Sequence, residues 1–250
     1  TIDKIYSEVK EESDYKDLSI SLKKDQKNFK EVISFNNVDF YFTGKPTLKK
    51  INLNIYKNDF IGIVGKTGSG KSTLLNLILG LHEPSSGKVV NNCKKISFVP
   101  QSIFLLDDTI INNLAFGVEK NEIDLELANK CMKSAQILDF VKSLPLGLNT
   151  IVGEKGVKIS GGELQRLAIA RALYLCPDLI IFDEATSSLD DATELKIIEI
   201  IEKLSKNITV IFVSHKLENL KNCTRVINIE NSEISEKTKQ KETKWMEIQF

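Results

Sequence analysis

The sequence contains few of the residues that mark a metalloprotein or a disulfide-bonded secreted domain. Its 250 residues include only two histidines and four cysteines. A structural zinc site needs four Cys or His ligands at short intervals, and a disulfide framework needs closely recurring cysteines in a short chain. The cysteines show no C-x-x-C spacing, so we expect reduced, mostly structural thiols and no zinc centre; they are Cys93, Cys131, Cys176 and Cys223.

Long apolar runs and an excess of charge of one sign are also absent. No stretch approaches the roughly 18 uninterrupted apolar residues that suggest a membrane-spanning helix. Lys and Arg total 34 and Asp and Glu total 34, so the formal net charge at pH 7 is zero. Binding to the nucleic-acid backbone normally relies on a basic surface. The balance therefore argues against nucleic acid as a partner.

One motif is present in full. The segment from residue 65 to 73 fits G-x-x-x-x-G-K-[ST], follows the apolar run 60–64 and precedes a helical pattern over 74–79. This strand–loop–helix context is what a phosphate-binding loop requires, because glycines let backbone N–H groups turn toward phosphate oxygens. We expect Lys71 to reach the β- and γ-phosphates of a nucleoside triphosphate and Ser72 to contact Mg²⁺. The expected nucleotide-binding residues of the loop are Gly65, Lys66, Thr67, Gly68, Ser69, Gly70, Lys71, Ser72 and Thr73.

The pattern of the strands predicts an α/β fold. Residues 32–42 and 48–55 alternate between apolar and polar, as half-buried strands do. Residues 179–182 and 208–213 are instead apolar throughout. Such strands suit a sheet that is covered on both faces, which indicates parallel strands joined by crossover helices.

Two neighbouring carboxylates follow the apolar strand 179–182. Asp183 stands where a phosphate-loop protein holds its Mg²⁺, and Glu184 comes directly after it. A carboxylate at that strand end can orient and deprotonate an attacking water molecule. We therefore predict Asp183 as a metal-holding residue and Glu184 as the general base.

A second segment, Ile159-Ser160-Gly161-Gly162-Glu163-Leu164-Gln165-Arg166, opens the next helix. Ser160 and Glu163 have the S-x-x-E spacing of a capping box, a purely structural explanation. Two glycines weaken a first turn and are not needed by a cap. They are explained if a phosphate approaches the backbone closely at this helix N-terminus.

Together with Ser187-Ser188-Leu189-Asp190, these motifs resemble the nucleotide-binding domain of an ATP-binding cassette transporter, from about Val32 to Asn231. The resemblance implies a parallel-sheet core of the P-loop NTPase type, a small antiparallel β subdomain and a helical subdomain that carries the signature motif. It also implies a linker over residues 1–31 that follows a transmembrane part outside this chain, and a polar tail over residues 232–250.

The resemblance assigns further roles. Phe42 matches the aromatic residue that stacks on adenine, with Tyr41 on the opposite face of the strand. Gln101 matches the glutamine that touches the metal and water, and His215 the histidine that contacts the γ-phosphate and orients the glutamate. The expected catalytic residues are thus Glu184, His215 and Gln101, and the expected metal-binding residues are Ser72, Gln101 and Asp183. In a head-to-tail pair, the residues expected to reach the partner's nucleotide or cross between subunits are Ser160, Gly161, Gly162, Glu163, Ser188 and Asp190.

The sequence also resembles one branch of the family, and it departs from the family pattern at two places. Residues 150–156 resemble a segment of exporter cassettes that meets the membrane part, so contacts through the Gln101 and Glu154 regions are expected. Glu163 stands where the family most often has Gln. The antiparallel region is longer in exporter cassettes, and here only residues 88–95 correspond to it, so we expect a shortened antiparallel subdomain. His82 is interpreted as structural.

These implications describe an ATPase with ATP and Mg²⁺, acting as the motor of an exporter on the cytoplasmic side of a cell membrane. The second copy is expected to be an identical chain. Two alternatives are a regulatory cassette that binds ATP but scarcely hydrolyses it, and a soluble cassette ATPase that acts on DNA or the ribosome. Glu184 and His215 speak against the first alternative. The zero net charge, and the lack of sustained heptads between the phosphate loop and the signature segment, speak against the second.

Overall fold

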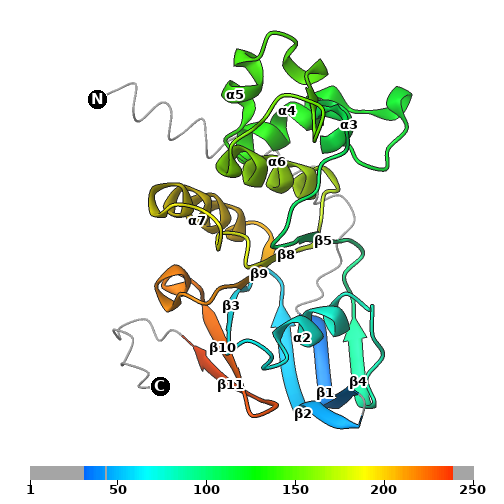
Figure 1. Ribbon diagram of the computed structural model, residues 1–250. Helices are drawn as coiled ribbons and strands as arrows, with labels where there is room; N and C mark the ends of the chain where they lie inside the picture. Colours follow the sequence, from blue (N-terminus) through cyan, green and yellow to red (C-terminus); the bar gives the residue numbers. More distant parts are fainter. Residues whose placement is uncertain (1–30, 43, 239–250) are drawn as a thin grey trace.

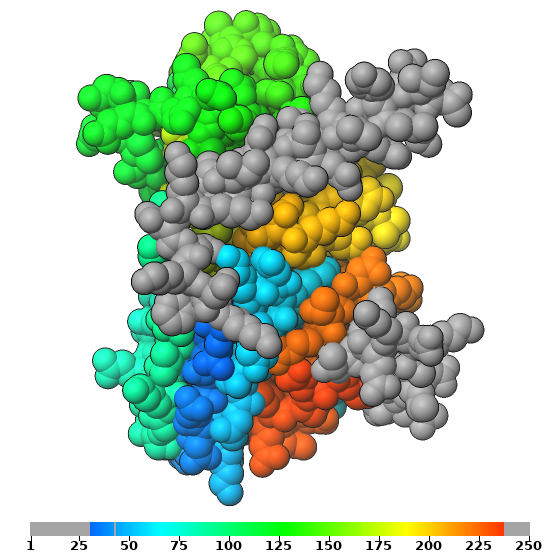
Figure 2. Space-filling view, turned by 180° about the vertical axis from the view of Figure 1, so that it is seen from behind, coloured from blue at the N-terminus to red at the C-terminus, as the bar shows by residue number. Residues whose placement is uncertain are grey.

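The computed structural model describes residues 31–42 and 44–238. Figure 1 shows three parts: a helical part at one end, a central sheet, and an antiparallel sheet at the other end. Figure 2 shows the same order from behind, with the helical part in green. The predicted linker over residues 1–31 lies outside the described residues except for Glu31, which begins a strand, and the last residues of the predicted tail, 239–250, also lie outside them.

The central sheet has six strands in the order β11-β10-β3-β9-β8-β5. All neighbours are parallel except β10 and β11, which form an antiparallel hairpin. The predicted parallel-sheet core is therefore confirmed. The strands are β3 (Phe60–Val64), β5 (Ile96–Val99), β8 (Leu179–Asp183), β9 (Thr209–Val213), β10 (Arg225–Glu230) and β11 (Glu233–Thr238).

Apolar clusters cover both faces of this sheet. In β8, Ile180 and Phe182 belong to the cluster that includes α6 (Gly161–Tyr174) and α7 (Asp191–Ser205), whereas Leu179 and Ile181 belong to the cluster that includes α2 (Lys71–Ile78) and the antiparallel sheet. Alternate side chains of a strand point to opposite faces, so a strand buried on both sides must be apolar throughout. This explains the uninterrupted apolar runs in the sequence.

The antiparallel sheet has three strands in the order β2-β1-β4: β1 (Glu31–Phe42), β2 (Lys45–Tyr56) and β4 (Ser86–Asn91). After β4 only residues 92–95 remain before β5 begins. The small antiparallel subdomain that the sequence predicted is therefore present, with a short return to the central sheet. The predicted alternation of β1 and β2 holds only in part: residues 51–55 of β2 alternate, whereas residues 32–35 of β1 are all buried, and bulges interrupt the pairing on both sides of Val38 opposite Ile51 and of Phe40 opposite Leu48.

The helical part lies between β5 and β8. Its helices pack on α6, and the apolar cluster continues from them into the sheet. It contains α3 (Ile110–Leu114), α4 (Leu125–Ser134), α5 (Leu138–Ser143), the 3₁₀ segments η1 (Lys120–Glu122) and η2 (Gly147–Asn149), and the short strands β6 (Asp108–Thr109) and β7 (Ile151–Val152). A third 3₁₀ segment, η3 (Leu217–Leu220), follows β9.

The strand β11 extends the sheet into the segment that the sequence assigned to a polar tail, because an edge strand needs few apolar residues to pair with its neighbour.

No disulfide joins the four cysteines, and burial raises the pKa of the Cys93 and Cys131 thiols to about 12, which suppresses the reactive thiolate. No helix among the described residues is long and apolar enough to cross a membrane.

Candidate nucleotide-binding and catalytic site

The phosphate loop connects β3 to α2 and is shaped for close backbone approach. Gly65, Gly68 and Gly70 all have positive φ, at 156°, 77° and 109°. A Cβ on Gly65 would lie 2.5 Å from Ser69 Oγ and 2.7 Å from the Ile229 carbonyl oxygen, so a side chain is excluded there. The loop conformation therefore depends on glycine.

The start of α2 offers unpaired donors to an anion. Its N-cap is Gly70, which has no side chain that could accept from the first N–H groups, and no acidic residue stands in the first turn. The Ser69 hydroxyl is buried in the same loop without a hydrogen-bond partner among the described residues. Free N–H groups and an unsatisfied hydroxyl at a helix N-terminus fit a phosphate group.

Lys71 is buried at the first position of α2, with 7% of its surface exposed. Its ammonium donates to the carbonyl oxygens of Gly65 (2.8 Å) and Lys66 (3.2 Å). Its positive charge also acts to lower the pKa of Asp183. Lys71 is thus held between the loop and the end of β8, where a terminal phosphate would need a counter-charge.

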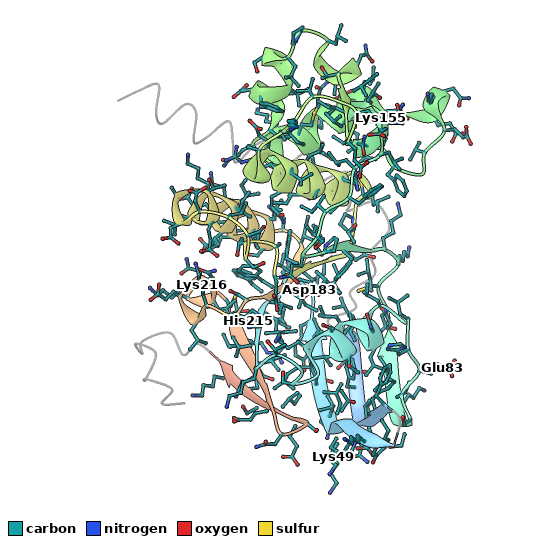
Figure 3. All side chains as sticks on the ribbon, viewed as in Figure 1. Lys49, Glu83, Lys155, Asp183, His215 and Lys216 are labelled. Atoms are coloured by element: carbon teal, nitrogen blue, oxygen red, sulfur yellow. The ribbon has the colours of Figure 1, made fainter. Side chains whose placement is uncertain are left out.

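The two carboxylates after β8 meet the histidine after β9. His215 Nε2 lies 2.6 Å from Glu184 Oε1, close enough for a hydrogen bond from the ring to the carboxylate. Burial raises the pKa of Asp183, the Glu184 charge adds to that rise, and Lys71 and His215 oppose it. Glu184, Lys71 and His215 therefore all lie close enough to Asp183 to act on its charge, and Figure 3 shows Asp183 and His215 at the middle of the molecule.

The topology explains this convergence. The strands β3, β9, β8 and β5 are neighbours and run parallel, so their carboxyl ends lie along one edge of the sheet. Ligands of open α/β sheets bind at that edge. Gln101 follows β5 there, and its side-chain amide donates to Ser187 Oγ at 3.3 Å. The structure thus brings Gln101 toward the segment that follows Glu184.

The residues expected to hold Mg²⁺ would offer it only a few oxygen atoms. No group of three or more His, Cys, Asp or Glu side chains that could hold a metal ion occurs within residues 31–42 and 44–238. Mg²⁺ is commonly held by one or two protein oxygens together with phosphate oxygens and water. Asp183, the exposed Ser72 hydroxyl and the exposed Gln101 amide provide such a sparse oxygen set.

Three rings lie together near the end of β1. Phe42 is 57% exposed, and its ring centroid lies 5.9 Å from that of Phe40 and 6.2 Å from that of His82. The ring of Phe40 stacks on His82 at 5.3 Å. The exposed Phe42 ring thus has packed rings behind it and a free surface in front.

The signature segment lines a second, separate cavity. Ser160 caps α6, and its N–H and hydroxyl both donate to Glu163 Oε2 at 2.7 Å, while the Glu163 N–H donates back to Ser160 Oγ. A polar cavity of about 230 Å³ opens at this helix start and includes no phosphate-loop residue. It is lined by Ser160, Gly161, Gly162, Glu163, Arg166, Ser188, Leu189, Asp190 and Thr193.

Packing accounts for one of the two signature glycines. A Cβ on Gly162 would lie 2.5 Å from Thr193 Cγ2, whereas a Cβ on Gly161 would meet only Leu189 Cδ2, at 3.3 Å. The sequence argument held that a structural cap leaves both glycines unexplained. That argument was wrong for Gly162, because the start of α7 packs directly against it.

Comparison with known proteins identifies the family. The model of the ABC transporter family matches residues 48–187. The alpha-hemolysin translocation ATP-binding protein HlyB of Escherichia coli O157:H7 is 41% identical over 224 residues, which cover 84% of this chain and 31% of HlyB. The chain belongs to the ABC transporter family. Its residues form an ATPase domain of that family, with the fold that the sequence predicted.

Two further ABC proteins resemble the chain. The ATP-dependent lipid A-core flippase of Ralstonia nicotianae is 35% identical over 219 residues, which cover 82% of this chain and 37% of the flippase. A bacterial Atm1-family ABC exporter solved with ATP bound superposes with a TM-score of 0.74 and 29% identity, over 85% of this chain and 39% of the exporter. The chain thus spans roughly a third of the length of these ABC proteins.

Sequence reasoning missed one polar residue that this ABC domain places beside its site. Glu194 is only 5% exposed and contacts Lys216, the neighbour of His215. A signal was present, because Glu194 precedes Ile197, Ile198 and Ile201 at the spacing of one apolar helix face. A carboxylate on that face predicts a buried charge that needs a partner.

Proposed function

We propose that this chain is the ATP-hydrolysing motor domain of an ABC export transporter and that two copies work as a head-to-tail pair. The 2.6 Å contact between His215 Nε2 and Glu184 Oε1, beside a phosphate loop whose glycines have positive φ, is the observation that carries the hydrolytic part. HlyB and the lipid A-core flippase are named for translocation and for flipping, which supports export or flipping as the work done.

In this proposal, the residues at the sheet edge have different roles in hydrolysis. The N–H groups of the phosphate loop and the Lys71 ammonium bind the β- and γ-phosphates of ATP. Glu184 takes a proton from the attacking water, and His215 holds the Glu184 carboxylate in place and contacts the γ-phosphate. Mg²⁺, held by Ser72, Asp183 and Gln101, would neutralise charge that develops on the phosphate oxygens. Phe42 stacks on the adenine.

The signature cavity supports the use of two copies. It presents hydroxyl groups and the start of α6, as an anion site does, yet the residues that line it lie outside the chain's own phosphate loop. A second chain turned head to tail would place its ATP there. Binding of ATP then favours the closed pair and hydrolysis favours the open pair, because the two nucleotide states differ in their affinity for closure.

The surface near β6 and β7 supports docking of a membrane part. The segment after Gln101 pairs with the segment around Glu154, with Asp108 opposite Val152 and the Lys155 N–H donating to Asp107. Both segments belong to the helical part, where Figure 3 labels Lys155. Exposed apolar side chains gather on these two segments and on the turn after α3: Phe104, Leu106, Phe116, Ile151 and Val157. Such a patch suits a protein partner.

Replacement of Glu184 by Gln tests the hydrolytic proposal. We expect kcat to fall by about 10²–10⁴, the usual contribution of a general base. ATP binding should survive, because Glu184 acts on water rather than on the nucleotide. The matched control is Glu199→Gln, an exposed carboxylate on α7. Equal turnover of ATP by the Glu184 variant and the parent protein would remove Glu184 from this role, whereas negligible turnover by the parent protein itself would favour a regulatory cassette.

A further inference from the structure

Glu194 is a buried carboxylate that the hydrolytic mechanism does not use. It lies in the first turns of α7, where its N–H donates to the Asp190 carbonyl at 2.8 Å, and 5% of its surface is exposed. A buried carboxylate is unfavourable unless it is paired and hydrogen-bonded. Its surroundings must therefore supply that compensation.

Three partners from two segments, the one after β8 and the one after β9, supply it. Lys216 Nζ donates to Glu194 Oε2 at 2.6 Å and Asn219 Nδ2 donates to Oε1 at 2.9 Å. The buried Thr186 side chain adds a hydrogen bond. Burial raises the pKa of Glu194, but these hydrogen bonds outweigh it, so the pKa lies below its ordinary value. Glu194 is therefore ionised at neutral pH.

The partners of Glu194 hold the residues on both sides of His215. The Lys216 N–H donates to Ser214 Oγ at 3.1 Å, and Asn219 Nδ2 also donates to Ser214 Oγ, at 3.3 Å. His215 stands between these fixed residues and is itself 44% exposed at its side chain. Its position against Glu184 thus depends on how firmly Ser214 and Lys216 are held.

Thr186 links the same carboxylate to the segment that leads to the signature cavity. The Leu189 N–H donates to the Thr186 carbonyl oxygen at 3.2 Å, and Leu189 and Asp190 line the cavity. Asp190 in turn caps α7 through the Thr193 N–H at 3.0 Å. One side chain therefore joins the catalytic histidine segment to the surface that would meet the partner copy.

We propose that Glu194 is a positioning residue for ATP hydrolysis, which acts by holding the Ser214–Lys216 segment so that His215 stays against Glu184. This inference rests on the proposed hydrolytic role of Glu184 and His215. Glu194 touches neither nucleotide nor water in this role. Its effect on the reaction passes through the histidine.

A double-mutant cycle tests the inference. In the otherwise unchanged chain, we expect Glu194→Gln to lower kcat for ATP by about 10- to 100-fold, as misplacement of a catalytic group does, with KM for ATP unchanged. In a His215→Ala background, the same substitution should lower kcat no further, because the group through which it acts is gone. Glu199→Gln, on the exposed side of α7, is the matched control and should leave kcat unchanged in both backgrounds.

A second variant changes Lys216, the exposed partner in the contact with Glu194. The Lys216 side chain is 56% exposed, so Lys216→Gln should fold even if the Glu194 variant does not, and we expect it to lower kcat in the same direction. Equal losses of kcat with and without His215, or no loss in either variant, would overturn the positioning role. The proposed function fails in a different way, since Glu184→Gln would then hydrolyse ATP as fast as the parent protein.

Discussion

Among the residues of the candidate site other than glycine, Glu184 has the least common backbone conformation. Its φ of 51° lies in the left-handed region, which non-glycine residues adopt rarely and at a cost of about 1–3 kcal/mol. Its N–H donates to the Val213 carbonyl oxygen of β9, and its side chain meets His215. The bend at the end of β8 thus turns the carboxylate from the sheet toward the neighbouring strand's histidine.

Phe42 provides a prediction about nucleotide affinity. We expect Phe42→Ala to raise KM for ATP by about 5- to 150-fold, because stacking on a base contributes roughly 1–3 kcal/mol. Phe42→Tyr should keep KM near the parent value, since it retains the ring. Folding stability should change little, because the ring is 57% exposed. Steady-state ATPase assays over a range of ATP concentrations measure the effect.

The neighbouring Tyr41 is the matched control for Phe42. It is 44% exposed and lies one position earlier in β1, so its ring points to the other face of the strand. Tyr41→Ala should leave KM for ATP unchanged. An equal rise in KM for both alanine variants would show that loss of β1 packing, rather than loss of adenine stacking, causes the effect.

The helices α6 and α7 begin side by side at the signature cavity, and each is capped by its own residue. Ser160 caps α6 within a capping box, and Asp190 caps α7 by accepting from the Thr193 N–H. The close approach of the two helix starts requires Gly162, whose missing Cβ makes room for the Thr193 methyl group. The geometry of the cavity therefore depends on contact between the two helices as well as on the glycine-rich turn itself.

This contact predicts a compensating pair of substitutions. Gly162→Ala should lower the free energy of unfolding by about 1–3 kcal/mol, since an added methyl in a packed interface forces neighbours apart. Adding Thr193→Ser removes the clashing methyl and should restore most of that stability. Urea denaturation of the parent, both single variants and the pair measures it. Additive effects of the two substitutions would contradict the packing explanation of Gly162.

The sequence predicted those elements that carry a local signal. Apolar alternation marked β1 and β2, uninterrupted apolar runs marked β8 and β9, and the S-x-x-E spacing marked the start of α6. Contacts between distant segments left no such signal. The clash that keeps Gly162 and the network around Glu194 depend on how α7 packs, which spacing along one segment does not reveal. The strand β11 was missed because its pairing with β10 requires no apolar pattern.

At the scale of the whole molecule, the two surfaces that we propose to bind phosphate lie apart. The phosphate loop belongs to the sheet edge at β3, whereas the signature cavity lies at the start of α6, next to the helical part. The segment 186–190 runs from the proposed catalytic carboxylates to that cavity, so in the proposed pair each chain would present one half of a composite site on either side of this segment. Such a pair is isologous, because each copy offers the same two surfaces to the other.

Mixing two inactive variants tests this arrangement. Lys71→Ala removes the charge that holds the terminal phosphate, and Ser160→Arg fills the signature cavity, so each variant alone should hydrolyse ATP poorly. In a mixed pair, the intact phosphate loop of the Ser160 variant faces the intact signature of the Lys71 variant. We therefore expect ATPase activity in the mixture well above the sum of the two separate proteins, rising with protein concentration as the chains associate. A mixture that shows only that sum at every concentration, while the parent is active, would mean that a single chain contains the complete hydrolytic site.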